Sequence, residues 1–285
     1  MDDVWALAFL LKCPEVDIKL ITTSTGDTGY RASLVAKLLQ VAGREDIPIG
    51  VGIPLDDSPA THAQWLGDFS LANYGGEVLR DGVGALCDTV MSTPDLVTLV
   101  CIGPLPNIAA ALAREPELTT GARFVGMHGS LRKGYLGVEK PMREFNVKQH
   151  ALACQAVFRA NWHKTITPLD TCGTVMLSGE RFKQVCASPD PLAQAVLANH
   201  FGWYEAVKDW PIYKDLDAGQ QSSVLFDTVA VYLAFSDAML AMETLPIVVT
   251  PDGRTLIDDA GEPVQCATAW RDQEAFLDLL VARLA

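Results

Sequence analysis

The sequence has no run of lysine or arginine, and basic residues are outnumbered by acidic ones. It contains 22 Lys and Arg against 35 Asp and Glu, a formal net charge of −13. Proteins that bind nucleic acids neutralise phosphates with clustered basic side chains, so we expect no nucleic-acid partner. A glycine-rich phosphate loop and a basic clamp are also missing, which argues against phosphorylated substrates.

Long hydrophobic runs and cysteine motifs are missing as well. No window of about 18 apolar residues occurs, so we expect no membrane-spanning segment, and the chain does not open on a signal peptide. The seven cysteines form no CxxC motif or Cys/His cluster, which argues against a zinc site. Scattered free thiols are typical of a reducing compartment, and we therefore predict a cytoplasmic protein.

What the sequence does contain is an alternation of β-rich apolar runs and helical stretches, with 49% apolar residues overall. This alternation predicts right-handed βαβ units and one α/β domain over residues 1–285, with a mostly parallel central sheet and helices on both faces. Ligands of such sheets bind beyond the carboxyl ends of the strands, where we expect residues 56–76 and 200–221 to form loops. The expected strands are 16–23, 47–52, 96–102, 124–127 and 165–169, and the expected helices are 2–12, 30–42, 107–114, 149–160 and the end of 222–234.

The order of elements has one irregularity. A doubly wound α/β fold normally begins with a strand, yet this chain enters a helix directly after Met1. Either the fold lacks a central strand or the sequence starts late. We favour the second interpretation, in which the domain is N-terminally incomplete and an apolar strand precedes Met1.

Adjacent carboxylates stand at the start of the first expected helix. Asp2 and Asp3 suit a helix N-terminus, where aspartate accepts bonds from free N–H groups and meets the positive end of the helix dipole. The same pair also suits a hard cation with a neighbouring base, and the residues alone leave both interpretations open. Asn107 is interpreted as the N-cap of the helix at 107–114.

Five sequence blocks resemble, in order, the nucleoside hydrolase family that prefers inosine and uridine. Its strand-to-helix motif Asp-x-Asp-x-Gly-x-Asp-Asp-Ala ends in an Asp pair that Asp2 and Asp3 match. The blocks span some 230 residues at plausible spacing, so their shared order carries the resemblance. They are MDDVWALAFLLKCPEVDIKLITTSTGD (1–27), VTLVCIGPLPNIAAALAREPEL (97–118), FVGMHGS (124–130), REFNVKQHALACQAVF (143–158) and SSVLFDTVAVYLAF (222–235).

The resemblance implies a single nucleoside hydrolase-like, Rossmann-like domain that hydrolyses the N-glycosidic bond of a ribonucleoside, releasing free base and ribose. It implies Ca²⁺ as cofactor, with a Ca²⁺-bound water as nucleophile, because Ca²⁺ binds oxygen ligands and lowers the pKa of water. A homo-oligomer, dimer or tetramer, is also implied. The residues implied are Asp2 as general base, Asp3, Asp227 and the Met127 carbonyl as metal ligands, and Asp27, Glu144 and Asn146 as substrate-binding residues, with His128 as a possible addition.

The spacing of Glu144 and Asn146 carries an expectation of its own. In an extended segment, residues two apart point to the same face. A carboxylate and an amide on one face suit ribose hydroxyls, and Phe145 between them is then expected to turn toward the core.

The chain departs from the family pattern in ways that affect the leaving group. The first strand and the first two Asp of the N-terminal motif are absent, Phe226 stands where several members carry His, and residues 79–84 lack a preceding His. Val138 stands where the family carries an Asn that contacts ribose. The resemblance therefore does not identify the acid that protonates the leaving base, and it does not identify the preferred nucleobase. Candidate acids are His128, Trp203 and Tyr204.

Three other functions remain open at this point. The chain is compatible with a degenerate family member that binds ribosides without turnover. It is also compatible with a hydrolase of another ribosyl conjugate, such as a modified nucleoside. A structural or interaction protein is a third possibility, which only the incomplete N-terminal motif favours.

Overall fold

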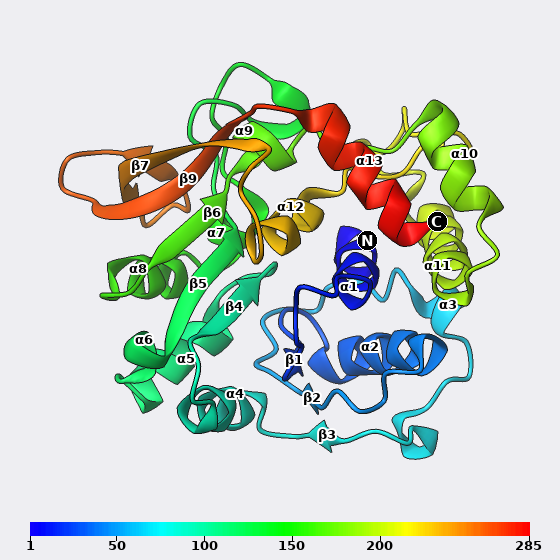
Figure 1. The fold of residues 1–285 in the computed structure, drawn as a ribbon, viewed down its shortest axis with the longest axis horizontal. Coiled ribbons are helices and arrows are strands. Elements are labelled where there is room, and N and C mark those ends of the chain that lie inside the picture. Colours follow the sequence, from blue (N-terminus) through cyan, green and yellow to red (C-terminus); the bar gives the residue numbers. More distant parts are fainter.

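The strands of the computed structural model, which describes residues 1–285, form two separate sheets. In the smaller sheet, β1, β2 and β3 pair in parallel; in the larger, β4, β5, β6 and β9 are parallel, and β7 is antiparallel to β9 and β8. The expected α/β fold is confirmed, with an antiparallel β7–β8 extension at one edge (Figure 1). The bounds are β1 (Ile21–Thr22), β2 (Ile49–Gly50), β3 (Val78–Leu79), β4 (Val97–Cys101), β5 (Ala122–Met127), β6 (Lys164–Thr167), β7 (Leu240–Val249), β8 (Thr255–Ile257) and β9 (Glu262–Trp270).

Helices cover both faces of the larger sheet. Phe124 and Val125 are neighbours on β5, so their side chains point to opposite faces, and each belongs to a different hydrophobic cluster. None of the helices is both long and apolar enough to cross a membrane. The helices are α1 (Asp2–Leu11), α2 (Thr28–Ala42), α3 (Ala63–Leu66), α4 (Gly82–Ser92), α5 (Pro106–Arg114), α6 (Leu118–Gly121), α7 (Phe145–Gln149), α8 (Ala151–Arg159), α9 (Leu169–Cys172), α10 (Gly179–Ala187), α11 (Pro191–Val207), α12 (Phe226–Leu233) and α13 (Gln273–Leu284), with short 3₁₀ turns η1 (Leu71–Asn73) and η2 (Tyr135–Gly137).

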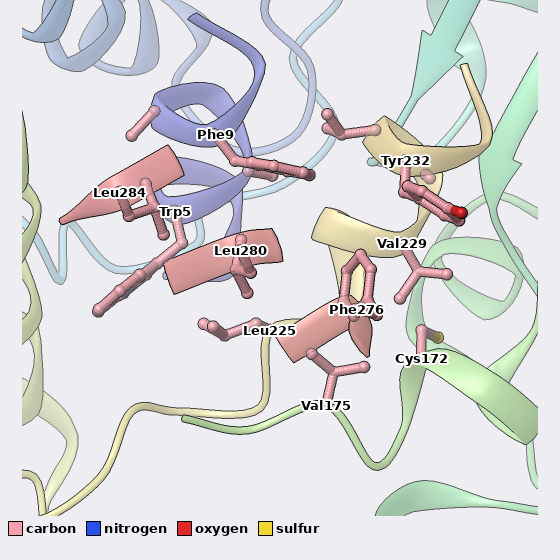
Figure 2. Packing of buried hydrophobic residues seen from close by; sticks show 14 of the residues in the cluster. Trp5, Phe9, Cys172, Val175, Leu225, Val229, Tyr232, Phe276, Leu280 and Leu284 are labelled. Carbon is pink, nitrogen blue, oxygen red and sulfur yellow. The ribbon is translucent and has the colours of Figure 1, made fainter. Parts of the chain in front are cut away.

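Helix α1 lies in the interior of the protein. Its sequence, DDVWALAFLL, is apolar around most of its circumference, which is typical of a buried helix. Trp5 and Phe9 are fully buried, and Phe9 packs edge-on against Phe276 of α13 with ring centroids 6.4 Å apart. Figure 2 shows these side chains of α1 meeting those of α12 and α13 in one core.

Several expected elements differ from the structure. The strand expected at 47–52 is paired only at Ile49–Gly50, and the loop expected at 56–76 contains α3 and η1. The helix expected at 149–160 is interrupted at His150, whose Nδ1 accepts a hydrogen bond from the Ala153 backbone N–H at 3.1 Å and so starts α8 separately. The loop expected at 200–221 begins as helix, because α11 continues to Val207. The strand expected at 16–23 has ladder pairing only at Ile21–Thr22.

Asn107 ties the two sheets together at their carboxyl ends. It was expected to cap α5, but that helix begins one residue earlier, and the Asn107 side chain instead spans two loops. Its Nδ2 donates to the Thr23 carbonyl after β1 (2.9 Å), and its Oδ1 accepts from the Ile53 N–H after β2 (2.8 Å). Gly52 permits this close approach, since a Cβ there would lie 2.3 Å from the Asn107 Nδ2. The carboxyl ends of both sheets therefore share one edge.

We expect Asn107→Ala to lower the free energy of unfolding by about 1–3 kcal/mol, because it leaves a buried carbonyl and a loop N–H without partners. The measurement is the midpoint of urea unfolding. Asn73→Ala, at an exposed position of η1, is the matched control and should leave the midpoint unchanged. Equal midpoints for both variants would contradict the role assigned to Asn107.

Candidate active site

The first turns of α1 and α12 place three carboxylates at one point. Asp2 and Asp3 begin α1, and Asp227 is the second residue of α12. One oxygen from each of the three lies within 4.8 Å of the others. The two helices pack against each other (Figure 1), so the positive ends of two helix dipoles meet at this cluster and favour negative charge there.

The electrostatics of the cluster are those of crowded like charges. Burial and the neighbouring carboxylates Asp2 and Asp3 raise the pKa of Asp227 well above its usual range. Burial also raises the pKa of Asp2 to about 6, although the Met1 ammonium acts in the opposite direction. For Asp3, the Met1 ammonium and Arg31 outweigh the effect of burial, and its pKa is lowered. The Met1 nitrogen lies 3.6 Å from an Asp2 oxygen and 3.4 Å from an Asp3 oxygen.

The cluster fits a hard divalent cation. Its donors are all carboxylate oxygens, which Ca²⁺ prefers, and it contains neither histidine nor cysteine. Two ligands of one Ca²⁺ lie at most about 5 Å apart, since each bond is about 2.3–2.6 Å. The observed separation of 4.8 Å or less is within this limit. One ammonium against three carboxylates leaves net negative charge, which a cation would neutralise.

Glu144, Asn146 and Met127 form a buried layer at the end of β5. The prediction of an extended segment here is wrong, because Glu144 is the N-cap of α7 and Asn146 lies inside that helix. Asn146 donates from Nδ2 to the Met127 carbonyl at 3.0 Å. Phe145, expected to face the core, is 50% exposed, because the helical turn rotates it outward.

Glu144 is held by backbone groups. Its Oε2 accepts from the N–H of Gly129 and of Val147, each at 3.1 Å, and its Oε1 from that of Asn146 at 2.7 Å. Burial raises the pKa of Glu144 to about 7 against these bonds, with a smaller contribution from the charge of Asp2. The carboxyl group therefore connects the loop after β5 with α7.

The remaining residues singled out in the sequence make local contacts. Asp27 is exposed and caps α2 by accepting from the Tyr30 N–H at 2.9 Å. His128 is fully buried, its Nε2 is 3.1 Å from the Gly103 carbonyl, and burial lowers its pKa to about 4. Trp203 is buried against Tyr213, with ring centroids 4.9 Å apart.

The structure adds residues that the sequence did not single out. Tyr135 packs edge-on against Phe226, with ring centroids 5.8 Å apart, and its hydroxyl accepts from the Phe145 N–H at 2.9 Å. His62 is buried, with its Nδ1 3.1 Å from the Asn199 Oδ1. Burial and the Met1 ammonium lower the pKa of His62 to about 3, against the opposing charge of Asp3. These contacts join segments that are distant in the chain, and no local sequence motif predicts them.

Comparisons with known proteins agree with one another. The family model described as Inosine-uridine preferring nucleoside hydrolase matches residues 1–278. The chain is 28% identical to the pyrimidine-specific ribonucleoside hydrolase RihA of Citrobacter koseri over 316 aligned positions, covering all of this chain and 95% of the relative. It is 33% identical to the non-specific ribonucleoside hydrolase RihC of Escherichia coli over 188 positions, covering 62% of this chain and 61% of the relative.

Solved structures share the fold. The plant nucleoside hydrolase PpNRh1 superposes with a TM-score of 0.83 at 21% identity, covering 99% of this chain and 95% of that one. The purine-preferring ribonucleoside hydrolase from Gardnerella vaginalis superposes with a TM-score of 0.77 at 21% identity, covering 99% and 94%. With the family model matching nearly the whole chain, this protein belongs to the inosine-uridine preferring nucleoside hydrolase family.

Proposed function

We propose that the chain hydrolyses the N-glycosidic bond of a ribonucleoside, releasing the free base and ribose. The observation that carries this proposal is the convergence of Asp2, Asp3 and Asp227 at the carboxyl edge of an α/β sheet. The relatives support the same class of reaction, since those named above are ribonucleoside hydrolases. Their printed names differ in base preference, so the nucleobase does not follow from them.

Asp3, Asp227 and the carbonyl of Met127 are the groups we assign to Ca²⁺. When bound, the ion supplies a fixed positive charge that holds ribose hydroxyls and lowers the pKa of water. Asn146 is the positioning residue for the Met127 carbonyl, because its amide already donates to that oxygen at 3.0 Å. A carbonyl oxygen has two lone pairs and retains one for a cation.

Asp2 is assigned as the general base. A pKa of about 6 keeps it mostly ionised at neutral pH and close to the range in which a base is effective. It takes a proton from the attacking water while the water oxygen bonds to C1′ of the ribose. The bond from C1′ to the base nitrogen breaks with its electron pair leaving on the base, through an oxocarbenium-like transition state.

Ribose recognition is assigned to Asp27, Glu144 and Asn146. Each retains an oxygen lone pair beyond the backbone bonds described above, and carboxylate and amide oxygens are suitable acceptors for sugar hydroxyls. Glu144 has a second effect, since it holds the Gly129 N–H and thereby the loop that follows β5. Its loss should disturb both sugar binding and loop position.

Departure of the base is the step of the reaction that this site assists least. Phe226 and Tyr135 offer aromatic surface beside Asp227, but the phenyl ring of Phe226 cannot donate a proton. His128 is neutral and engaged with the Gly103 carbonyl, and we assign it to loop packing rather than acid catalysis. Substrates whose leaving groups depart without protonation should therefore react best.

Asp2→Asn should lower kcat by about 10²–10⁴-fold and largely spare KM, because it removes a proton acceptor used in the transition state. Steady-state kinetics with a p-nitrophenyl riboside provides the measurement. Asp237→Asn, on an exposed loop, makes the same chemical change away from the site and should leave kcat unchanged. Retained activity in Asp2→Asn would refute the assigned base.

Asp227→Ala should reduce Ca²⁺ retention and raise KM together, since it removes a ligand and not a proton acceptor. Calcium content after dialysis, measured by elemental analysis, gives a readout independent of turnover. Asp237→Ala is the control. If wild-type protein binds ribosides and Ca²⁺ but releases no base from any nucleoside, it is a binding protein and not a hydrolase.

Phe226→His should increase kcat/KM for inosine over wild type while changing little for p-nitrophenyl riboside, whose leaving group needs no proton. Wild type should prefer the activated riboside. Phe201→His, at an exposed site on α11, controls for the added imidazole. Inosine cleaved by wild type as fast as the activated riboside would mean that another acid acts in this site.

A further inference from the structure

Aromatic rings lie beside the carboxylate cluster at the start of α12. Phe226 is the first residue of that helix and directly precedes Asp227, and its ring packs edge-on against that of Tyr135, with centroids 5.8 Å apart. Both side chains are only half-buried, so part of each ring stays uncovered. The two rings therefore present an apolar surface next to a group of negative charges.

A third ring approaches the same cluster from the loop after α11. The ring of Tyr213 packs edge-on against that of Trp203, with centroids 4.9 Å apart, and stacks with that of Trp210 at 6.2 Å. Burial raises the pKa of Tyr213, and the charge of Asp2 contributes to the shift. Burial and the charge of Asp2 also raise the pKa of Tyr135. Both phenols therefore lie in the field of Asp2, and both hold their protons more tightly than a free tyrosine does.

The buried histidines of the chain do not supply a proton for the leaving base. A neutral imidazole carries one ring proton, and in each of three buried rings one nitrogen faces an oxygen that only accepts, at 3.1–3.2 Å. That contact engages the single proton. The three are His62 with Asn199 Oδ1, His128 with the Gly103 carbonyl and His200 with the Ala218 carbonyl.

A riboside whose base is already cationic does not require such a proton. When its bond from C1′ to the base nitrogen breaks, the electron pair stays on that nitrogen, cancels the positive charge and releases a neutral base. The attacking water bonds to C1′ and gives one proton to Asp2, so the products are ribose, neutral base and one proton. A neutral nucleoside such as inosine instead releases an anion unless an acid protonates the base.

The aromatic rings also suit the binding of a positive charge. A cation above the face of an aromatic ring is attracted by the negative charge of that face. The only side-chain cation above a ring in this structure is Lys37 over Trp65, so no basic side chain of the protein occupies the faces of Phe226 and Tyr135. Arg31, whose charge acts on Asp3, donates from Nε to the Thr25 carbonyl at 2.7 Å.

We propose that this site is specific for ribosides whose base carries a permanent positive charge, as N-ribosylpyridinium compounds and N7-alkylated purine nucleosides do. The aromatic wall formed by Phe226, Tyr135 and Tyr213 holds the charged base. This inference rests on the proposed hydrolysis and narrows its substrate class. The phenyl ring of Phe226 gives a neutral purine neither a proton nor a hydrogen bond, and unpaired polar groups weaken binding.

Steady-state kinetics on a matched pair of nucleosides tests the specificity. 7-Methylguanosine differs from guanosine by one methyl group and one positive charge. We expect its kcat/KM to exceed that of guanosine by about 100-fold or more, because a missing general acid costs about 10²–10⁴-fold. In Phe226→His, which supplies an acid, the ratio between the two should fall by about tenfold or more. A ratio unchanged by this substitution would overturn the role of Phe226.

A second pair of substrates tests the binding of charge separately from the leaving group. Nicotinamide riboside and p-nitrophenyl riboside both react without protonation, but only the first is cationic. Phe226→Leu keeps an apolar side chain and removes the ring, so KM for nicotinamide riboside should rise by about 3–30-fold and KM for p-nitrophenyl riboside by less than about twofold. Phe201→Leu, at an exposed position on α11, is the control and should change neither. Equal changes in both KM values would overturn cation binding by the wall.

The outcomes distinguish this inference from the proposed hydrolysis. If guanosine and inosine are cleaved within about tenfold of the cationic ribosides, the specificity is wrong and the hydrolase function stands. If no riboside is cleaved, p-nitrophenyl riboside included, the hydrolase function is wrong, and isothermal titration then tests the ligand class. Tighter binding of nicotinamide riboside than of inosine would support a site for cationic ribosides, and equal or weaker binding would overturn it.

Discussion

The mutual repulsion of three carboxylates is the constraint on which this site depends. The interior packing of α1 against α12 and α13 places the first turns of α1 and α12 in contact. The aspartates of those turns are thereby brought together. Two helix dipoles favour the resulting charge, yet burial and the neighbouring carboxylates raise the pKa of Asp227 well above its usual range. Such a site favours the binding of a cation, because a bound cation relieves the repulsion between carboxylates that folding creates.

The carboxyl edge around this cluster is organised by polar side chains that hold loops. Asn107 connects the ends of β1 and β2 to α5, His128 contacts the loop after β4, and Asn146 binds the end of β5. Each is buried, and each contacts a backbone carbonyl that water cannot reach. The groups that shape the site are therefore also part of what holds the domain together.

The division of the sheet explains the weakness of β1. Residues 17–20 have a sequence suited to a strand, but a strand gains stability only from neighbours, and β1 has a neighbour on one side. The three-stranded sheet is joined to the rest by α1, α2 and α4 and by the contacts at the carboxyl edge.

The alternation of apolar runs and helices was sufficient to predict the α/β class and most elements, because periodicity and burial are local consequences of the chain. The resemblance of the blocks around Asp2, Asp3 and Asp227 to the family also implied a common site, and the three carboxylates do converge. The sequence could not show that Asn107 bonds to Thr23 rather than capping its own helix, a contact across 84 residues. Nor could it show that α7 turns Phe145 outward or that Tyr135 meets Phe226. Those outcomes depend on which backbone groups lack partners after the chain has packed, and only the tertiary structure decides that.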